Sequence, residues 1–267
     1  MVSILKSALK KLGLYYRVRD GRLGRLYKKI KPDIYYSAII AEEKLFDQAL
    51  LGENTQLIFD VGANAGHTTD YFRRRSKKVV AIEPVPENCI ALKSRFKNFA
   101  NVNIEEAAVT DKERELLLFI SDDSTHCVST VNEKWKHQVE AGGSKDTDIK
   151  YRKTIKVKGI TLAMLEEKYG SPDYIKLDIE GHEYPVIASL KKSVPVISFE
   201  THFPSFHNET ERCMFHLIHL AGGEHILFNA TTNDSSLVFE QYITPEMFSN
   251  WLFREQPSYC TIFCKSH

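Results

Sequence analysis

Beyond residue 55, short apolar runs alternate with segments in which apolar residues recur every three or four positions. The runs predict strands, and the periodic segments predict helices that cover a sheet. The expected strands are residues 56–62, 77–84, 101–110, 115–121, 173–181, 194–202, 225–230 and 259–266. The expected helices are residues 67–75, 86–99, 160–170, 182–192 and 211–223. Strands that alternate with helices favour an α/β fold, with a mostly parallel central sheet and helices on both faces.

Some positions in this pattern carry further expectations. In the second expected helix, the apolar positions expected to face the sheet are Ile90, Leu92, Phe96 and Phe99. The polar, glycine-containing stretch at residues 138–148 predicts a mobile loop, and a lid over a site is one interpretation of it. Cys260 and Cys264 lie in the apolar run of the last expected strand, so we expect both in the core.

The first 52 residues are expected to form a basic, helical extension, while residues 53–267 are expected to form one domain. Residues 1–31 contain ten Lys or Arg side chains and one acid. Helical spacing relates four apolar residues near the start: Val2, Leu5, Leu9 and Leu12. A second helix is expected over residues 35–51. The first helix either packs on the domain as a cap or makes a peripheral contact with an anionic membrane surface.

Composition narrows the class of protein. The chain has 267 residues, of which 43% are hydrophobic and 27% charged, and its net charge is +1. These values are typical of a globular, soluble protein and give no reason to expect a nucleic-acid partner. Five scattered cysteines without a CxxC pair, and the lack of a secretory signal or a long apolar run, favour a cytoplasmic location. Peripheral contact with the inner face of the membrane is the alternative, and a homo-oligomer is left open.

The turn after the first expected strand carries the first chemical signal. Asp60, Gly62, Asn64 and Gly66 form the pattern DxGxNxG directly after an apolar run. Glycines permit positive φ angles and close approach of the backbone to a ligand, whereas an acid at the turn repels a pyrophosphate. The turn therefore suits a ligand with a cationic end, such as S-adenosylmethionine. Glu83 ends the next expected strand, where an acid accepts hydrogen bonds from ribose hydroxyls.

Four stretches in order, FDVGANAGHTT, AIEPVPEN, IKLDIEGHEYPVI and SFETH, resemble the FkbM family of S-adenosylmethionine-dependent methyltransferases. The resemblance covers residues 55–265 and implies a Rossmann-like class I methyltransferase fold. It implies that the methyl donor is bound by Asp60, Gly62, Asn64, Gly66, Glu83, Ala107, Ala108 and Asp178. It also implies that residues 121–131, a loop rich in small polar side chains, line the acceptor site. In that loop His126 is more simply explained as a solvent-facing residue.

Acids and histidines cluster at the ends of two expected strands and supply candidates for proton transfer: Asp178, Glu180, His182, Glu200 and His202. A sugar hydroxyl is a poor nucleophile at neutral pH, so a side chain must take its proton or a metal must lower its pKa. His182 is expected at a helix N-terminus, which favours the neutral, basic imidazole. It is the first candidate for the base, before Asp178 and His202, although a helix-capping role explains it nearly as well. Asp178, Glu180 and Glu200 could instead hold Mg²⁺, an alternative that is not favoured.

The predicted function is an S-adenosylmethionine-dependent O-methyltransferase that releases S-adenosylhomocysteine. The resemblance implies an acceptor hydroxyl on a saccharide, in a cell-surface glycan or its precursor, with a secondary metabolite or a lipid as the alternative. A cofactor-binding module that regulates a glycan-synthesis partner is the non-enzymatic alternative. A nicotinamide dehydrogenase is disfavoured because the chain lacks GxGxxG. A nucleic-acid base methyltransferase is disfavoured because LDIEG stands where an Asn/Asp-Pro-Pro-aromatic motif is expected.

Overall fold

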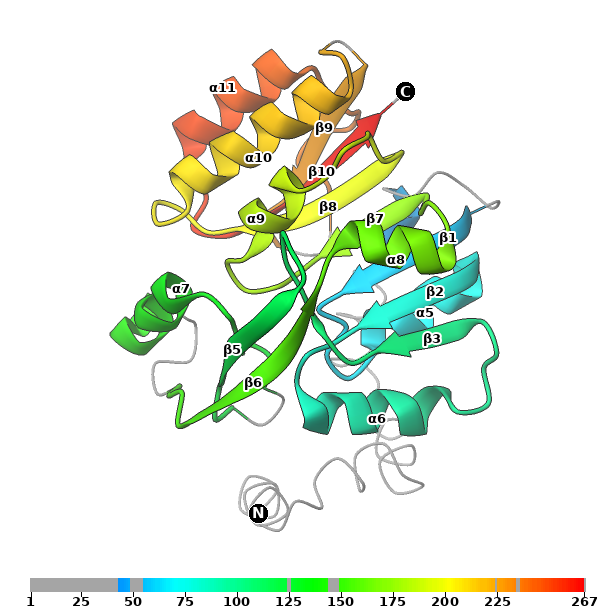
Figure 1. Cartoon of the computed structure of the whole chain (residues 1–267). Coiled ribbons are helices and arrows are strands. Elements are labelled where there is room, and N and C mark those ends of the chain that lie inside the picture. Colours follow the sequence, from blue (N-terminus) through cyan, green and yellow to red (C-terminus); the bar gives the residue numbers. More distant parts are fainter. Residues whose placement is uncertain are drawn as a thin grey trace, which may run out of the picture.

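A central sheet of seven strands forms the middle layer of the structure (Figure 1). The computed structural model describes residues 43–48, 55–123, 126–143, 149–223, 225–233 and 236–266. The strand order is β3-β2-β1-β7-β8-β10-β9. The strands are β1 (Thr55–Val61), β2 (Ser76–Ile82), β3 (Val102–Glu105), β7 (Tyr174–Leu177), β8 (Val196–Thr201), β9 (Ile226–Thr231) and β10 (Cys260–Ser266). Only β10 runs opposite to the other strands of this sheet, so the expectation of a mostly parallel sheet is confirmed.

Helices cover both faces of this sheet, as the alternating pattern predicts. They are α5 (His67–Arg75), α6 (Pro86–Phe96), α8 (Leu162–Tyr169), α9 (Glu183–Ala188), α10 (His207–Leu220) and α11 (Pro245–Glu255). Successive side chains of β1 point to opposite faces. Phe59 packs in a core cluster with residues of α8, α9, α10 and α11, whereas Ile58 packs with Tyr71 and Phe72 of α5. Both faces are therefore dry, which explains why β1 reads as a continuous apolar run.

A second, three-stranded sheet is inserted in the chain between β3 and β7. It has the order β4-β6-β5, with β4 (Ala108–Val109), β5 (Arg114–Ile120) and β6 (Lys153–Ile160). The long β5–β6 hairpin projects from the main sheet and carries α7 (Glu133–Gln138) near its tip (Figure 1). We call residues 108–160 the insert. The single strand expected over residues 101–110 is thus wrong, because it divides into β3 and β4, which belong to different sheets.

Other local predictions need correction. Leu92 and Phe96 are buried as expected, but Ile90 is 68% exposed because it lies off the face of α6 that packs. Phe99 lies beyond the end of α6 and is 38% exposed, with the Arg73 guanidinium 3.7 Å from its ring centroid. The expected loop at 138–148 begins with a helical turn, Val139–Gly143. Strand β6 and helices α7 and α11 were not predicted at all.

The expectations for the N-terminal extension fall mostly outside the described residues, including the basic helix and its membrane contact. Residues 43–48 are helical, which agrees with part of the helix expected over 35–51. Leu45 and Phe46 are buried against α5 and the sheet. Within the part of the chain that the structure describes, no helix is both long and apolar enough to cross a bilayer. Cys260 and Cys264 are in the core, as predicted.

Candidate active site

The turn between β1 and α5 is built on left-handed backbone. Gly62, Asn64 and Gly66 have φ angles of 82°, 48° and 78°. A Cβ atom on Gly62 would lie 1.8 Å from the carbonyl oxygen of Asp178, and one on Gly66 would lie 2.5 Å from the ring of Phe96. The two glycines therefore let the end of β7 and helix α6 approach the turn, in addition to permitting its conformation.

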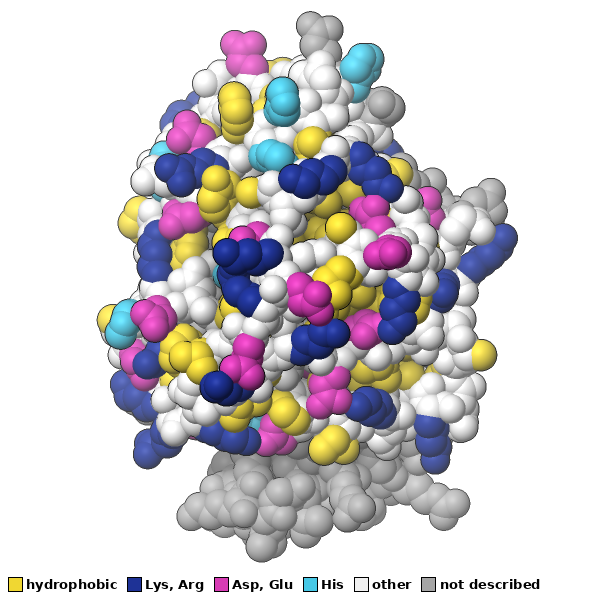
Figure 2. Space-filling view, in the orientation of Figure 1, with side chains coloured by type: hydrophobic (Ala, Val, Ile, Leu, Met, Phe, Trp, Pro, Cys, Tyr) yellow, Lys and Arg dark blue, Asp and Glu magenta, His cyan; other side chains and the backbone are white. Residues whose placement is uncertain are grey.

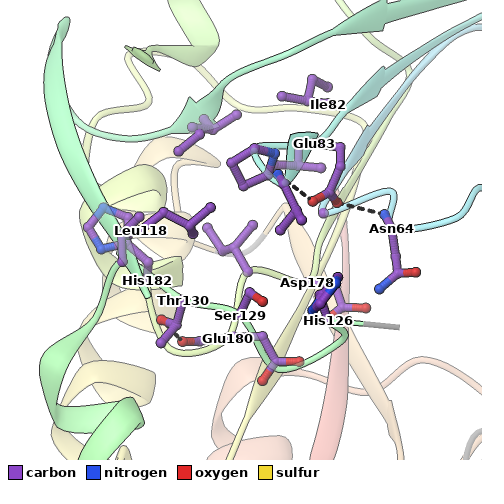
Figure 3. Close-up of a pocket in the computed structure, with 18 of the residues that line it drawn as sticks. Asn64, Ile82, Glu83, Leu118, His126, Ser129, Thr130, Asp178, Glu180 and His182 are labelled. Atoms are coloured by element: carbon purple, nitrogen blue, oxygen red, sulfur yellow. Dashed lines mark hydrogen bonds between the residues drawn. The ribbon is translucent and has the colours of Figure 1, made fainter. Parts of the chain in front are cut away.

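Glu83 faces this turn from the end of β2 and is almost fully buried. Its Oε2 atom accepts a hydrogen bond from the backbone N–H of Asn64 (2.8 Å), and its Oε1 atom accepts one from that of Val85 (2.9 Å) (Figure 3). Burial raises the pKa of Glu83 to about 7, although both N–H groups favour the ionised form. Each oxygen retains a further lone pair, so the carboxylate can still accept a hydroxyl hydrogen from a ligand.

Asp60 lies beneath the turn, where it holds the turn to the helix that follows. The hydroxyl of Thr69 in α5 donates to its Oδ2 atom (2.5 Å), and its Oδ1 atom has no partner among the described residues. Burial raises the pKa of Asp60, and the nearby Lys176 ammonium opposes that rise. Lys176 is paired across the sheet with Asp60 and also forms an ion pair with Asp178 (2.8 Å between Nζ and Oδ2).

One pocket gathers most of the residues that the sequence singled out. The predicted residues that line it are Gly62, Asn64, Glu83, Ala107, Ala108, Asp178, Glu180, His182 and Glu200. Asp60, Gly66 and His202 are absent from its lining. The loop of the insert supplies a further wall that includes Ser129 and Thr130, and His126 lines it too instead of facing only solvent. The pocket therefore lies between the end of the main sheet and the insert.

Three carboxylates converge at one side of this pocket. Asp178 and Glu180 follow β7 and Glu200 belongs to β8, and one oxygen of each lies within 4.8 Å of the others. The hydroxyl of Tyr259 donates to Glu200 (3.1 Å). Burial, then the charges of Glu200 and Asp178, raise the pKa of Glu180 well above its usual range. Clustered carboxylate oxygens suit either a divalent cation or the hydroxyls of a ligand.

The two histidines lie apart from one another. His182 precedes α9 as expected, yet its ring makes no capping hydrogen bond, and its Nε2 atom lies 3.1 Å from the hydroxyl of Thr110. It is on the opposite side of the pocket from Asp178 (Figure 3). Burial and the Arg114 charge lower the pKa of His182 to about 4, so the ring is neutral at pH 7 but weakly basic.

His202 is held in an aromatic stack outside the pocket lining. Its ring centroid lies 4.3 Å from that of Trp135 and 5.5 Å from that of Tyr259. Its Nε2 atom is 3.9 Å from a carboxylate oxygen of Glu200. Burial lowers the pKa of His202 to about 4. This position suits support of Glu200 better than direct contact with a ligand.

Sequence reasoning missed several residues that shape the pocket. Lys176 is a charged residue within an otherwise apolar strand, and this exception was a signal that could have marked it as part of the site. Tyr259 and Trp135 gave none, because both reach the site only through the tertiary fold. Thr130 fell inside the loop assigned to the acceptor, but its specific contact with Glu180 could not be foreseen (2.7 Å from the hydroxyl to the carbonyl oxygen).

Comparison with protein-family models gives a match to the methyltransferase FkbM domain over residues 60–228, which is more than half of the chain. The chain belongs to the FkbM methyltransferase family. The resemblance seen in the sequence is thereby confirmed, and with it the Rossmann-like class I methyltransferase fold. Membership of the family implies that the methyl donor is S-adenosylmethionine. No curated protein sequence matched the chain.

Solved structures similar to this FkbM methyltransferase have low sequence identity to it. Methyltransferase FkbM from Methylobacillus flagellatus KT has 14% identity and a TM-score of 0.47, and the match covers 88% of this chain and 50% of that one. The chain thus spans half the length of that protein. A TehB-like SAM-dependent methyltransferase from Corynebacterium glutamicum has 11% identity, a TM-score of 0.42 and coverage of 88% and 89%. Precorrin-6y C5,15-methyltransferase from Geobacter metallireducens has 12% identity, a TM-score of 0.40 and coverage of 85% and 86%.

The pocket of this FkbM methyltransferase fits its methyl donor in chemical terms. The Glu83 carboxylate offers lone pairs to ribose hydroxyls, and Ile82, Val109 and Leu118 provide apolar lining for a base. Four acids line the pocket, and no described lining residue is Lys or Arg, which suits a sulfonium cation. When bound, the donor supplies a methyl group that is already activated for transfer.

Proposed function

We propose that this FkbM methyltransferase transfers the methyl group to a hydroxyl of a saccharide, in a cell-surface glycan or its precursor. The observation that carries the proposal is the convergence of Asp178, Glu180 and Glu200 in the pocket that the turn between β1 and α5 also lines. A saccharide presents several hydroxyl donors close together, and carboxylate oxygens within 4.8 Å of one another can accept from adjacent ones. The site therefore favours a polyol over an acceptor with a single polar group, such as most lipids.

The charge of the lining also supports a neutral acceptor group at the reacting end. Glu83, Asp178, Glu180 and Glu200 face the pocket, and its described lining contains no Lys or Arg. A phosphate or carboxylate placed there would be repelled by these carboxylates. If the acceptor is a nucleotide-linked or lipid-linked sugar, its phosphates lie outside this pocket.

The chain's own residues contribute position and proton acceptance. The pocket walls from the main sheet and the insert would hold the acceptor oxygen beside the methyl group, and in-line alignment supplies much of the acceleration of such a transfer. The hydroxyl must also lose its proton, which requires a group within hydrogen-bond reach. His182 lines the pocket but is weakly basic and faces Thr110, and His202 lies behind Glu200. The carboxylates of Asp178, Glu180 and Glu200 are therefore better candidates than the histidines for accepting this proton.

A nucleic-acid acceptor has less support. The net charge is +1, and Figure 2 shows Lys and Arg side chains interspersed with Asp and Glu over one face of the molecule. Non-specific binding to nucleic acid depends on clustered positive charge. We propose that the enzyme acts in the cytoplasm on a small-molecule or glycan acceptor. A peripheral membrane contact would be made through the N-terminal residues outside the described part.

Transfer of radiolabelled methyl groups tests the proposed function. Purified enzyme is incubated with labelled S-adenosylmethionine and a pool of lipid-linked and nucleotide-linked sugars, in parallel with RNA, DNA and a protein mixture. Label in the saccharide fraction supports the proposal. Label only on nucleic acid or on protein amines contradicts it. Binding of S-adenosylhomocysteine without transfer to any pool would favour the regulatory module.

A further inference from the structure

We propose that Glu180 takes the proton from the acceptor hydroxyl, and that Thr130 and Asn132 hold Glu180 in place for this step. The inference rests on the proposed function and names a catalytic residue and two positioning residues for it. In the step, the O–H bond breaks and its electron pair forms the new bond from the acceptor oxygen to the methyl carbon. The pair of the broken C–S bond stays on sulfur. The proton goes to a carboxylate oxygen of Glu180 and then to solvent.

Availability of the carboxylate is the first reason. Of the four acids that line the pocket, Glu83 accepts two backbone N–H groups, Asp178 is paired with a lysine, and Glu200 accepts a tyrosine hydroxyl. The carboxylate of Glu180 accepts no hydrogen bond from any described residue. A base must have lone pairs free for the proton it removes. Glu180 is therefore the carboxylate best placed to receive one.

The backbone of Glu180 is the second reason. Its φ angle is 55°, in the left-handed region that non-glycine residues rarely adopt, and Gly181 follows with a φ angle of 88°. Strained backbone of this kind persists only where the surroundings enforce it, and it is concentrated at functional sites. Glu180 also lines the pocket, and one of its carboxylate oxygens lies within 4.8 Å of those of Asp178 and Glu200.

Two side chains of the insert enforce this conformation. The hydroxyl of Thr130 donates to the carbonyl oxygen of Glu180 (2.7 Å), and the amide Nδ2 of Asn132 donates to that of Gly181 (Figure 3 shows the first). Both successive carbonyls of the strained segment are thus held from the same short stretch. Each tether contacts the backbone, so it fixes the direction of the Glu180 side chain without occupying its carboxylate.

The tethers are themselves fixed. Asn132 caps α7, where its Oδ1 atom accepts the N–H of Lys134 (2.8 Å), and its own N–H donates to the Thr130 hydroxyl (2.8 Å). On the other side, a Cβ atom on Gly181 would lie 2.9 Å from the ring of Phe206 and 3.0 Å from Cβ of Trp135. The insert and the start of α10 therefore enclose the Glu180–Gly181 peptide from two directions.

His182 is less suited to the same role. The Thr110 hydroxyl donates to Asp111 (2.9 Å), so it has no hydrogen left for the His182 Nε2 atom that lies 3.1 Å away. The Nε2 atom must then carry the hydrogen of that contact. Nε2 is then a donor, and only Nδ1 of the neutral ring is left to accept a proton. His182 also lies across the pocket from Asp178 (Figure 3).

The Glu180→Gln variant tests the base directly, because it keeps the shape of the side chain but cannot take a proton. With labelled S-adenosylmethionine and the pool of lipid-linked and nucleotide-linked sugars, kcat should fall by about 10²–10⁴. Affinity for S-adenosylhomocysteine should stay within about twofold, which also shows that the variant folds. Glu115→Gln, on the exposed face of β5, is the matched control and should retain the wild-type rate.

Retention of at least a tenth of the wild-type rate by Glu180→Gln would overturn the assignment while leaving the proposed function intact. A wild-type enzyme that binds S-adenosylhomocysteine but transfers no label to saccharide would instead overturn the proposed function, and the base with it. Restoration of Glu180→Ala activity by added formate would support the assignment further, because formate supplies the missing carboxylate.

The tethers are tested by paired substitutions. Thr130→Val removes the hydroxyl at nearly constant volume and should lower kcat about tenfold, with little change in KM for S-adenosylmethionine, whereas Thr130→Ser should recover most of the rate. Asn132→Asp keeps the acceptor that caps α7 but loses the donor to Gly181, so it should also lower kcat selectively. Equal rates for Thr130→Val and Thr130→Ser would show that the hydroxyl does not position Glu180.

Discussion

The two halves of the pocket differ in which parts of the chain supply their residues and in how their carboxylates are hydrogen-bonded. The donor half, residues 60–66 with Glu83, comes from two adjacent strands, and each oxygen of its Glu83 carboxylate accepts one backbone N–H group. The acceptor half, comprising Thr130, Asn132, Asp178, Glu180 and Glu200, is assembled from the insert and from the ends of β7 and β8, and long-range hydrogen bonds from the insert hold its backbone. In the donor half, backbone N–H groups hold the Glu83 carboxylate in place. The acceptor half keeps an unengaged carboxylate, as expected where chemistry rather than binding is the task.

The largest effect is expected from a substitution that prevents the close approach of Gly62 to the Asp178 carbonyl, where the two halves meet. Gly62→Ala would place a Cβ atom 1.8 Å from the Asp178 carbonyl oxygen in a left-handed backbone. We expect a loss of at least about 3 kcal/mol in the free energy of unfolding, measured by denaturant titration, and loss of S-adenosylhomocysteine binding.

Gly142→Ala is the matched control for that substitution. Gly142 has a φ angle of 91°, but a Cβ atom there would meet nothing within 4 Å. Only the backbone strain remains, so the cost should be about 1–2 kcal/mol. Equal destabilisation by the two alanines would show that the contact between Gly62 and the end of β7 is unimportant.

A smaller effect is expected within the donor half. Glu83→Gln keeps the size of the side chain but replaces a charged acceptor, so affinity for S-adenosylhomocysteine should fall about 10–30-fold in calorimetric titration. The ionised carboxylate is the better acceptor for ribose hydroxyls. Because burial raises the pKa of Glu83 to about 7, wild-type affinity should rise between pH 6 and pH 8. The same pH series on Glu83→Gln should be flat, and an equal pH dependence in both proteins would exclude Glu83 as its cause.

A substitution of His182 tests whether the histidine or Glu180 accepts the proton. His182→Gln should lower kcat by less than about tenfold, since the ring faces Thr110 and its role there is structural support. The rates of His182→Gln and Glu180→Gln are compared under identical conditions. If His182→Gln lost more of its kcat than Glu180→Gln, His182 would be the base, as the sequence favoured.

The smallest expected effect is that of chelation. The Lys176 ammonium already forms an ion pair with Asp178, and the Tyr259 hydroxyl donates to Glu200, so two of the three carboxylates have partners without a metal. The transfer rate should therefore stay within about twofold in excess EDTA. A tenfold or greater loss that Mg²⁺ restores would assign the three carboxylates to a cation instead.

Most of the donor half could be predicted from the sequence because it is local. The order acid, glycine, asparagine and glycine encodes the turn, and Glu83 stands at the tip of the next parallel strand. The convergence of Asp178 and Glu200 was also foreseeable, since neighbouring parallel strands end at one edge of a sheet. These inferences need only strand periodicity and adjacency.

The acceptor half could be predicted only in part because its contacts are long-range. Thr130 and Asn132 reach residues 180 and 181 through a sheet whose strand β6 alternates lysine with apolar residues and was not predicted. The left-handed φ angle of Glu180 has no signal in its residue type. The direction of the His182 ring, toward Thr110, follows from burial against the insert and not from its place before α9.

Carbon-13 spectroscopy of the reaction product tests the central claim most directly. The enzyme is incubated with methyl-labelled S-adenosylmethionine and the lipid-linked and nucleotide-linked sugars, and the labelled fraction is isolated. The account predicts a methoxy carbon attached to a saccharide ring. A label found as an N-methyl, C-methyl or S-methyl group, or on a molecule that contains no sugar, would contradict it.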